Sequence, residues 1–253
     1  MLRSFGPWTD RRYFLDKMSL KDLVVAFFTH YSIQAYILII LAAGTVSALT
    51  AQSWHRPALT VAVTLVLYPL IEYLLHRFVL HGKFLFKHPS TAKLWKRIHY
   101  DHHQNPHDLS VLFGALYTTL PTIALITLTL GGLIGGVSGA AASLATGCLI
   151  FSVYEFAHCV QHLPWTPRNA WLRDIKRNHL AHHFHNEQGN FGITSSVWDR
   201  VLGTYYAQPK DVRRSPTAHN LGYTAEMAER YPWVAALSED EETYARQRRR
   251  RTA

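Results

Sequence analysis

Histidine is the residue type in this chain whose number and spacing indicate a chemical site. The sequence of 253 residues holds 16 histidines, and ten of them fall into four clusters. Residues three and four apart share one face of a helix and can aim at one metal ion. His76 and His81 are five apart, so we expect them to straddle a helix end. The clusters are His76-x4-His81, His99-x2-His102-His103, His158-x3-His162 and His179-x2-His182-His183.

The number of clustered histidines indicates more than one metal ion. Neutral imidazole is a good ligand for iron, copper, nickel and zinc. A single ion takes about four to six ligands, so ten histidines suit two ions close together. Three histidines lie near the clusters but outside their spacing, and their role stays open: His88, His107 and His185. The others singled out are read as ordinary surface or core residues: His30, His55 and His219.

Carboxylates adjoin three of the clusters. Glu72 lies four residues before His76, Asp101 lies within the second cluster, and Glu155 lies three residues before His158. A metal-bound imidazole usually donates its other N–H to a carboxylate or a carbonyl, which fixes its orientation. We expect these carboxylates to orient histidines. The alternative is that Glu72 and Glu155 only mark helix ends at a membrane boundary.

The elements that must position the clusters are apolar helices. Positions 109–154, 46 residues, contain no Asp, Glu, Lys, Arg or His. A hydrocarbon core about 30 Å thick takes roughly 20 apolar residues in a helix, so this interval suffices for two crossings. The glycine-rich segment 131–139 supplies a turn between them. We predict an all-α integral membrane protein with four transmembrane helices, at about 32–51, 58–75, 112–130 and 140–157.

Basic residues predict how these helices are oriented. Of the 26 Lys and Arg residues, 25 fall in segments on the same side of the predicted spans, and only Arg56 falls on the opposite side. Because Lys and Arg accumulate in short cytoplasmic segments, both termini and all four clusters are expected to be cytosolic. The membrane would be a bacterial inner membrane or the endoplasmic reticulum. This bias also explains the net charge of +9, and no nucleic-acid partner is expected.

The chain divides into three parts on this reading. Residues 1–30 form a cytosolic N-terminal arm, residues 31–206 a membrane-embedded domain with a cytosolic histidine cap, and residues 207–253 a cytosolic C-terminal tail. Cys148 lies in a predicted span and Cys159 beside histidines. A disulfide framework is therefore not indicated, and both cysteines suit a reducing compartment.

The stretch from about Tyr68 to Tyr206 resembles the fatty acid hydroxylase and sterol desaturase superfamily of membrane di-iron enzymes. The resemblance rests on three segments: EYLLHRFVLH at 72–81, HLAHH at 179–183 and FGITSSVWDRVLGT at 191–204. By eye it is nearest to the sphingolipid fatty acid 2-hydroxylases. The segment after His103, Gln104 to Asp108, follows the family's sequence only loosely.

The resemblance implies a fold, a cofactor and partners. The fold is four transmembrane helices capped by a cytosolic helical domain that holds a dimetal site. The implied cofactors are two iron ions, with zinc possible in purified protein, and O2. The segment 194–204 would support the site. Eukaryotic sphingolipid enzymes carry a fused cytochrome b5 domain that is not visible here, so a separate electron donor is expected: cytochrome b5, a ferredoxin or a reductase. The implied ligands are His76, His81, His99, His102, His103, His158, His162, His179, His182 and His183.

The expected function is O2-dependent hydroxylation of a lipid C–H bond, above all 2-hydroxylation of a fatty acyl chain of a membrane lipid. Alternatives within the superfamily are a desaturase, or a hydroxylase of a sterol, a carotenoid or an aminolipid headgroup. A metal transporter would instead place ligands inside the spans. A membrane metallohydrolase would need a base, for which Glu155 is available, on a zinc-bound water. The sequence does not indicate an oligomeric state.

Overall fold

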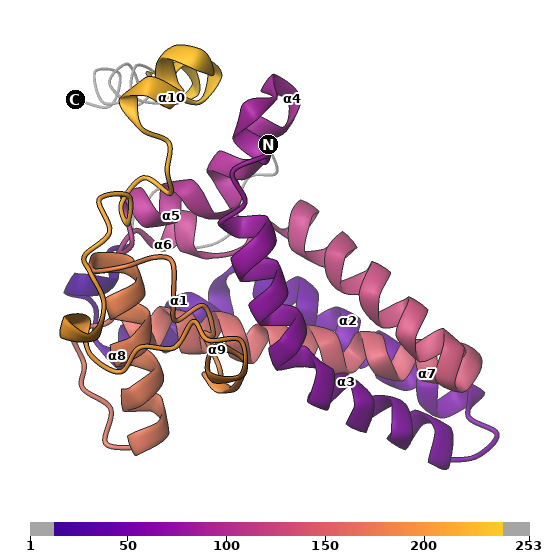
Figure 1. Ribbon diagram of the computed structural model, residues 1–253. Coiled ribbons are helices and arrows are strands. Elements are labelled where there is room, and N and C mark those ends of the chain that lie inside the picture. Colours follow the sequence, from indigo (N-terminus) through magenta and orange to yellow (C-terminus); the bar gives the residue numbers. More distant parts are fainter. Residues whose placement is uncertain (1–12, 240–253) are drawn as a thin grey trace, which may run out of the picture.

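The computed structural model describes residues 13–239, and this part of the chain is all-helical (Figure 1). Two π-helical turns (Leu75–Leu80 and Lys96–Tyr100) and three short 3-10 turns (Leu15–Lys17, Leu85–Lys87 and Pro209–Asp211) interrupt or connect the α-helices. The α-helices are α1 (Leu20–Thr29), α2 (Tyr31–Thr50), α3 (His55–Leu74), α4 (Pro89–Trp95), α5 (Asp101–Gln104), α6 (Leu109–Leu112), α7 (Leu116–His162), α8 (Ala170–Phe184), α9 (Val197–Val201) and α10 (Ala225–Arg230).

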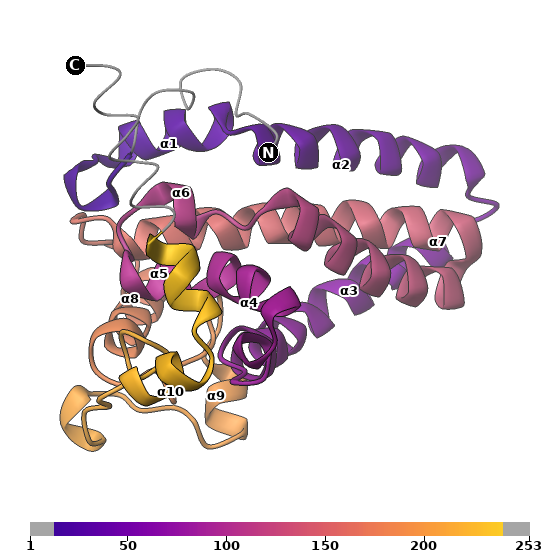
Figure 2. The same cartoon turned by 90° about the horizontal axis from the view of Figure 1, so that it is seen from above.

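Three stretches of the described chain are long and apolar enough to cross a membrane. They are Tyr31–Thr50, His55–Lys87 and Leu109–His162. Their helices α2 and α3 both pack along α7 (Figures 1 and 2). Large apolar side chains on the outside of this bundle are exposed, among them Leu38, Val66 and Leu125. An apolar exterior of this kind suits a hydrocarbon surrounding.

Helix α7 reverses direction within the glycine-rich segment. Gly135 and Gly136 have non-helical backbone angles, and the positive φ of 60° at Gly136 favours glycine. The two arms lie against each other, because a Cβ added at Gly131 would come within 2.3 Å of the Gly139 carbonyl oxygen. The predicted turn at 131–139 is confirmed, and α7 forms the predicted helical hairpin.

The helices differ in their bounds from the predicted spans, which themselves stay a prediction. The first arm of α7 begins at Leu116 and not at 112, because residues 113–115 are extended after the short helix α6. The second arm continues to His162 rather than 157, which keeps the third histidine cluster on the helix. The predicted spans 32–51 and 58–75 correspond to α2 and α3 within three residues at each end.

The described part of the N-terminal arm is packed against the bundle. Ser19 and Asp22 form a reciprocal capping box at the start of α1, with Asp22 N donating to Ser19 Oγ at 3.2 Å. Leu15, Leu23 and Phe27 are buried in a core shared with the end of α7. Residues 1–12 lie outside the described range.

The described part of the C-terminal tail is also packed. Tyr223 and Val234 are buried with Phe86 and Trp95, which precede the second histidine cluster. Trp233 Nε1 donates to the Phe86 carbonyl oxygen at 2.6 Å. The chain after α9 thus returns to cover the segment between the first two clusters, while residues 240–253 lie outside the described range.

The close approach of the two arms of α7 gives a test of the hairpin. We expect Gly131→Ala to destabilise the protein by roughly 1–3 kcal/mol, the usual cost of an overpacked interior. The matched control is Gly132→Ala, whose Cβ would meet only Ala140 Cβ at 4.0 Å. The thermal midpoint of the purified protein in detergent should fall for the first variant only. Equal midpoints would contradict the packing described.

Candidate metal centre

All ten clustered histidines converge at one end of the bundle. His76 lies in the π-helical turn after α3 and His81 directly follows it, while His99, His102 and His103 lie on the next π-helical turn and α5. His158 and His162 end α7, and the last three lie on α8. Nine of the ten are buried, and His81 is partly buried. Four separate stretches of chain therefore meet in one polar cluster.

A wide helical turn explains the five-residue spacing of the first cluster. His81 N donates to the His76 carbonyl oxygen at 3.0 Å, which is the i to i+5 bond of a π-helix. The wider turn places the two rings next to each other, with centroids 4.9 Å apart and planes inclined by 60°. The expectation that this pair straddles a helix end is confirmed, with the π-helical turn as its means.

One group of possible ligand nitrogens consists of His76, His81, His99 and His182, whose ligand atoms lie within 4.8 Å of one another. His99 Nε2 lies 3.1 Å from His76 Nε2 and 3.0 Å from His81 Nε2. His81 Nε2 in turn lies 3.1 Å from His182 Nε2. One imidazole nitrogen carries at most one hydrogen, so these contacts cannot all be hydrogen bonds. A shared cation accounts for the convergence.

Backbone carbonyls fix which nitrogen of several rings faces inward. His76 Nδ1 lies 2.5 Å from the Phe191 carbonyl oxygen and His182 Nδ1 lies 2.7 Å from that of Gly189. A carbonyl can only accept, so each Nδ1 carries the hydrogen and each Nε2 presents a lone pair to the centre. His103 Nδ1 makes the same contact with Ala218, at 2.7 Å.

The second group consists of five buried histidines with ligand atoms within 4.8 Å of one another: His102, His158, His162, His179 and His183. His162 Nε2 lies 2.9 Å from His179 Nε2. Both ring nitrogens of His102 and of His183 are buried without a hydrogen-bond partner in the described chain. Unpaired buried nitrogens are costly, and a bound cation would satisfy them.

His103 lies between the two groups and belongs to neither by distance. Its Nε2 lies 3.1 Å from His99 Nε2, and its ring stacks on that of His183 with centroids 4.1 Å apart. The tenth histidine is therefore placed at the junction of the two groups, and its ligand role stays a prediction.

Burial keeps these imidazoles in the form that binds metal. Loss of water contact lowers the pKa of His103 and of His182 to about 3. It also lowers the pKa of four further histidines of the cluster well below the usual range: His99, His102, His179 and His183. Neutral, converging nitrogens in two groups fit two metal ions, and this donor set suits iron or zinc.

The carboxylates play a different part from the one expected. Glu72 accepts from Ile193 N at 2.5 Å and from Thr194 N at 2.9 Å, and within the described residues it makes no bond to His76. Glu155 accepts from Gly114 N at 2.9 Å. Asp101 forms a buried ion pair with Lys96, at 2.7 Å. The expectation that carboxylates orient the histidines is thus wrong for Glu72, because a carbonyl already accepts from His76.

The segment 194–204 supports the site, as expected, and it does so by holding residues 191–193. Asp199 accepts from Phe191 N and Gly192 N, both at 2.8 Å, and so holds the carbonyl that orients His76. A Cβ at Gly192 would lie 1.9 Å from the Ser195 carbonyl oxygen, so only glycine fits this tight loop. Glu72 and Asp199 therefore act on the histidines through the loop they hold.

The histidines outside the clusters divide as follows. His88 caps α4 by accepting from Ser90 N at 3.3 Å, and His185 Nε2 bonds the Val212 carbonyl oxygen at 2.9 Å. His107 lies beside the centre, with its ring centroid 5.8 Å from that of His162. His30 is buried and stacked on Phe113, whereas the remaining two are exposed, His55 and His219.

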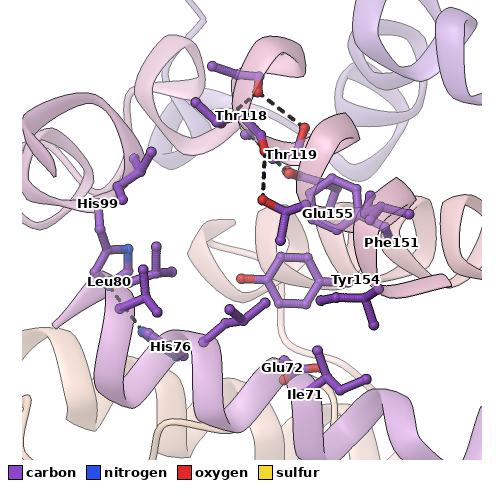
Figure 3. Close-up of a pocket in the computed structure, with 18 of the residues that line it drawn as sticks. Ile71, Glu72, His76, Leu80, His99, Thr118, Thr119, Phe151, Tyr154 and Glu155 are labelled. Atoms are coloured by element: carbon purple, nitrogen blue, oxygen red, sulfur yellow. Dashed lines mark hydrogen bonds between the residues drawn. The ribbon is translucent and has the colours of Figure 1, made fainter. Parts of the chain in front are cut away.

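An apolar cavity of about 490 Å3 adjoins the histidines (Figure 3). His76, His99, His102 and His158 form one end of its lining. Between α3 and α7 it extends to Thr64 and Leu130. With a rise of 1.5 Å per residue, the wall from Thr118 to Leu130 is about 18 Å long. The cavity is therefore long and apolar, with the histidine cluster at one end.

Two tyrosines in this cavity were not anticipated. The Tyr154 hydroxyl points into the cavity (Figure 3), and Tyr68 lines it as well. Tyr154 precedes His158 by four residues, and Tyr68 precedes Glu72 by four. Helical spacing from the histidine clusters was the signal that could have identified them.

Comparison with known proteins agrees with this geometry. The sequence profile described as "Fatty acid hydroxylase" matches residues 61–204, more than half of the chain. The chain therefore belongs to the fatty acid hydroxylase family. The solved structure "Full length scs7p (only hydroxylase domain visible)" superposes with a TM-score of 0.64 and 26% identity, covering 75% of this chain and 69% of that one.

Three relatives are about 30% identical in sequence to this chain over the region that aligns with it. The dihydroceramide fatty acyl 2-hydroxylase FAH2 of Arabidopsis thaliana is 30% identical over 63% of this chain and 66% of its own. The ceramide very long chain fatty acid hydroxylase scs7 of Schizosaccharomyces pombe is 35% identical, over 56% of this chain and 41% of its own. The human fatty acid 2-hydroxylase is 29% identical, over 54% and 37%. The chain thus matches less than two thirds of each relative's length.

The two histidine groups predict a metal stoichiometry. We expect about two iron or zinc ions per chain by mass spectrometry of the metals, one for each group. His182→Ala removes one of the four nitrogens of the first group and should lower the content to about one ion. His55→Ala, at an exposed histidine far from the centre, is the control and should keep two. Equal metal content in the two variants would contradict the assignment of His182.

Proposed function

We propose that this protein is an O2-dependent monooxygenase that hydroxylates carbon 2 of the fatty acyl chain of a sphingolipid. The observation that carries the proposal is the long apolar cavity with a histidine cluster at one end. Membership of the fatty acid hydroxylase family supports the reaction, and the names of two relatives, a dihydroceramide fatty acyl 2-hydroxylase and a ceramide very long chain fatty acid hydroxylase, support a ceramide or dihydroceramide acyl chain.

Two iron ions held by the ten histidines would supply the activation of O2, with zinc able to occupy the same nitrogens in purified protein. The residues of the chain bind the lipid and exclude water. The apolar walls of the cavity hold the acyl chain and keep water from the reacting carbon. Tyr68 and Tyr154 also line the cavity, and their hydroxyl groups would be available to polar atoms of the bound lipid.

The proposed setting is a membrane crossed four times, by α2, α3 and the two arms of α7. Arg56 lies near the α7 turn, because a Cβ at Gly135 would lie 3.5 Å from Arg56 Cβ. The other basic residues of the described chain belong to segments at or beyond the histidine end. This distribution supports a cytosolic centre and cytosolic termini. The cavity then runs within the depth of the bilayer, where an acyl chain can enter from the lipid.

The other reactions considered have less support. A transporter would need metal ligands along the spans, and both histidine groups of the described chain lie at one end. A hydrolase would use Glu155, whose Oε2 is buried without a partner in the described chain, as a base. An apolar cavity of this length and the family relationship favour oxidation of an acyl chain.

Lipid analysis tests the reaction. Cells that make sphingolipids but no 2-hydroxy acyl chains should gain sphingolipids with one added oxygen at carbon 2 when they express the protein. Growth under labelled O2 should place the label in that hydroxyl group, and His182→Ala should abolish the product. Loss of two hydrogens without added oxygen would identify a desaturase, and an unchanged lipid profile would contradict the proposal.

The cavity gives a second prediction, on chain length. Leu130→Trp should fill its far end and shift the products towards shorter acyl chains, with at least a several-fold loss of the longest ones. Leu125→Trp is the matched control, since Leu125 lies on the same arm and is 72% exposed on the outside. The chain-length distribution of the hydroxylated products is the readout. A shift of equal size in both variants would argue against this cavity as the acyl site.

A further inference from the structure

A cationic face lies on the side of the histidine centre away from the apolar cavity. It consists of five residues from α8 and the segment after Pro209: Arg173, Lys176, Arg177, Arg213 and Arg214. They line two adjoining surface hollows, of about 910 and 710 Å3, which share Arg214 and Phe184. In the described chain no Asp or Glu lines either hollow. Arg177 is paired with Asp174 at 3.1 Å, and Lys176 Nζ donates to the Trp165 carbonyl oxygen at 2.8 Å, so the charge of the face depends chiefly on Arg173, Arg213 and Arg214.

An exposed aromatic ring lies between the two hollows. Phe184 is 50% exposed although its neighbour His183 is buried. Its ring centroid lies 6.2 Å from that of His183. An exposed aromatic group surrounded by charge is typical of the centre of a protein interface.

The cationic face reaches the histidine centre directly. His103 and His183 line the first hollow and stack on each other at 4.1 Å. The apolar cavity, by contrast, is lined by His76, His99 and His158 from the opposite side. The histidine cluster thus separates an apolar side from a cationic side.

The face lies far from the apolar ends of the spans. Helix α8 is at the end of the molecule opposite the turn of α7, and it crosses the direction of the long helices (Figure 1). In the proposed setting this places the face on the cytosolic side, directed away from the bilayer. A soluble partner is therefore favoured over an anionic membrane surface.

We propose that this cationic face is the docking site of an acidic one-electron carrier protein. The inference rests on the proposed function, which requires electrons: R–H + O2 + 2 e− + 2 H+ gives R–OH + H2O. One oxygen atom enters the C–H bond and the other is reduced to water, with both protons taken from solvent. Two reduced carriers, docking in turn, are each oxidised by one electron. Charge complementarity steers the encounter, and Phe184 brings the carrier within contact of the His183 and His103 rings.

Binding measurements on the metal-loaded protein in detergent test the site without reference to the lipid product. The probes are the soluble haem domain of cytochrome b5 and a [2Fe–2S] ferredoxin, both acidic, with the basic cytochrome c as a negative control. We expect the acidic carriers to bind at low ionic strength and to weaken as salt is added. Arg213→Glu/Arg214→Glu should raise the dissociation constant about tenfold or more, and Arg213→Gln/Arg214→Gln should raise it by a smaller factor.

The matched control reverses two cations elsewhere on the cap. Lys87→Glu/Lys93→Glu makes the same change in net charge at exposed positions outside both hollows and should alter binding less than about threefold. All variants should keep the parent metal content, which separates lost docking from a damaged centre.

If the arginine variants bind the acidic carriers as tightly as the lysine variant does, the proposal is overturned. If the face bound anionic lipid instead of a carrier protein, the arginine and lysine variants would likewise bind the acidic carriers equally, and the proposal would be overturned. Docking with no hydroxylated lipid would leave this inference standing and refute the proposed function.

Discussion

The structure depends on imidazole lone pairs that converge where hydrogen bonds cannot satisfy all of them. His99 Nε2 alone lies within 3.1 Å of three other ring nitrogens. Such an arrangement is unfavourable in a dry interior unless a cation is shared. The surrounding elements serve to hold it: carbonyls of the chain after α8 fix the tautomers, and Glu72 and Asp199 hold the loop that carries one of those carbonyls.

Much of this centre could be predicted from residue type and spacing. The ten histidines come together because intervals of three, four and five residues each define one face of a helical turn. The hairpin was visible because a long uncharged interval is broken by glycines at its middle. Both patterns are formed by residues close together in the chain, so a single sequence is enough to show them.

What could not be predicted depends on contacts between distant segments. Glu72 is four residues before His76, yet its partners Ile193 and Thr194 are more than a hundred positions away. The acceptor of His103 is likewise a carbonyl of a distant loop, at Ala218. Any residue can supply a carbonyl, so sequence composition gives no sign of it. The cavity was equally hidden, because it depends on how far α3 and α7 separate.

The order of the ligands along the chain has a consequence for biogenesis. Each metal group combines histidines that precede the α7 hairpin with others that follow it: His102 joins His158, and His182 joins His76. In the proposed topology, neither group can be completed during synthesis until the hairpin has entered the bilayer and returned. A hairpin that failed to return would leave the two halves of each group on opposite sides of the membrane. A chain whose hairpin is misinserted would therefore lack a complete set of ligands for either metal ion.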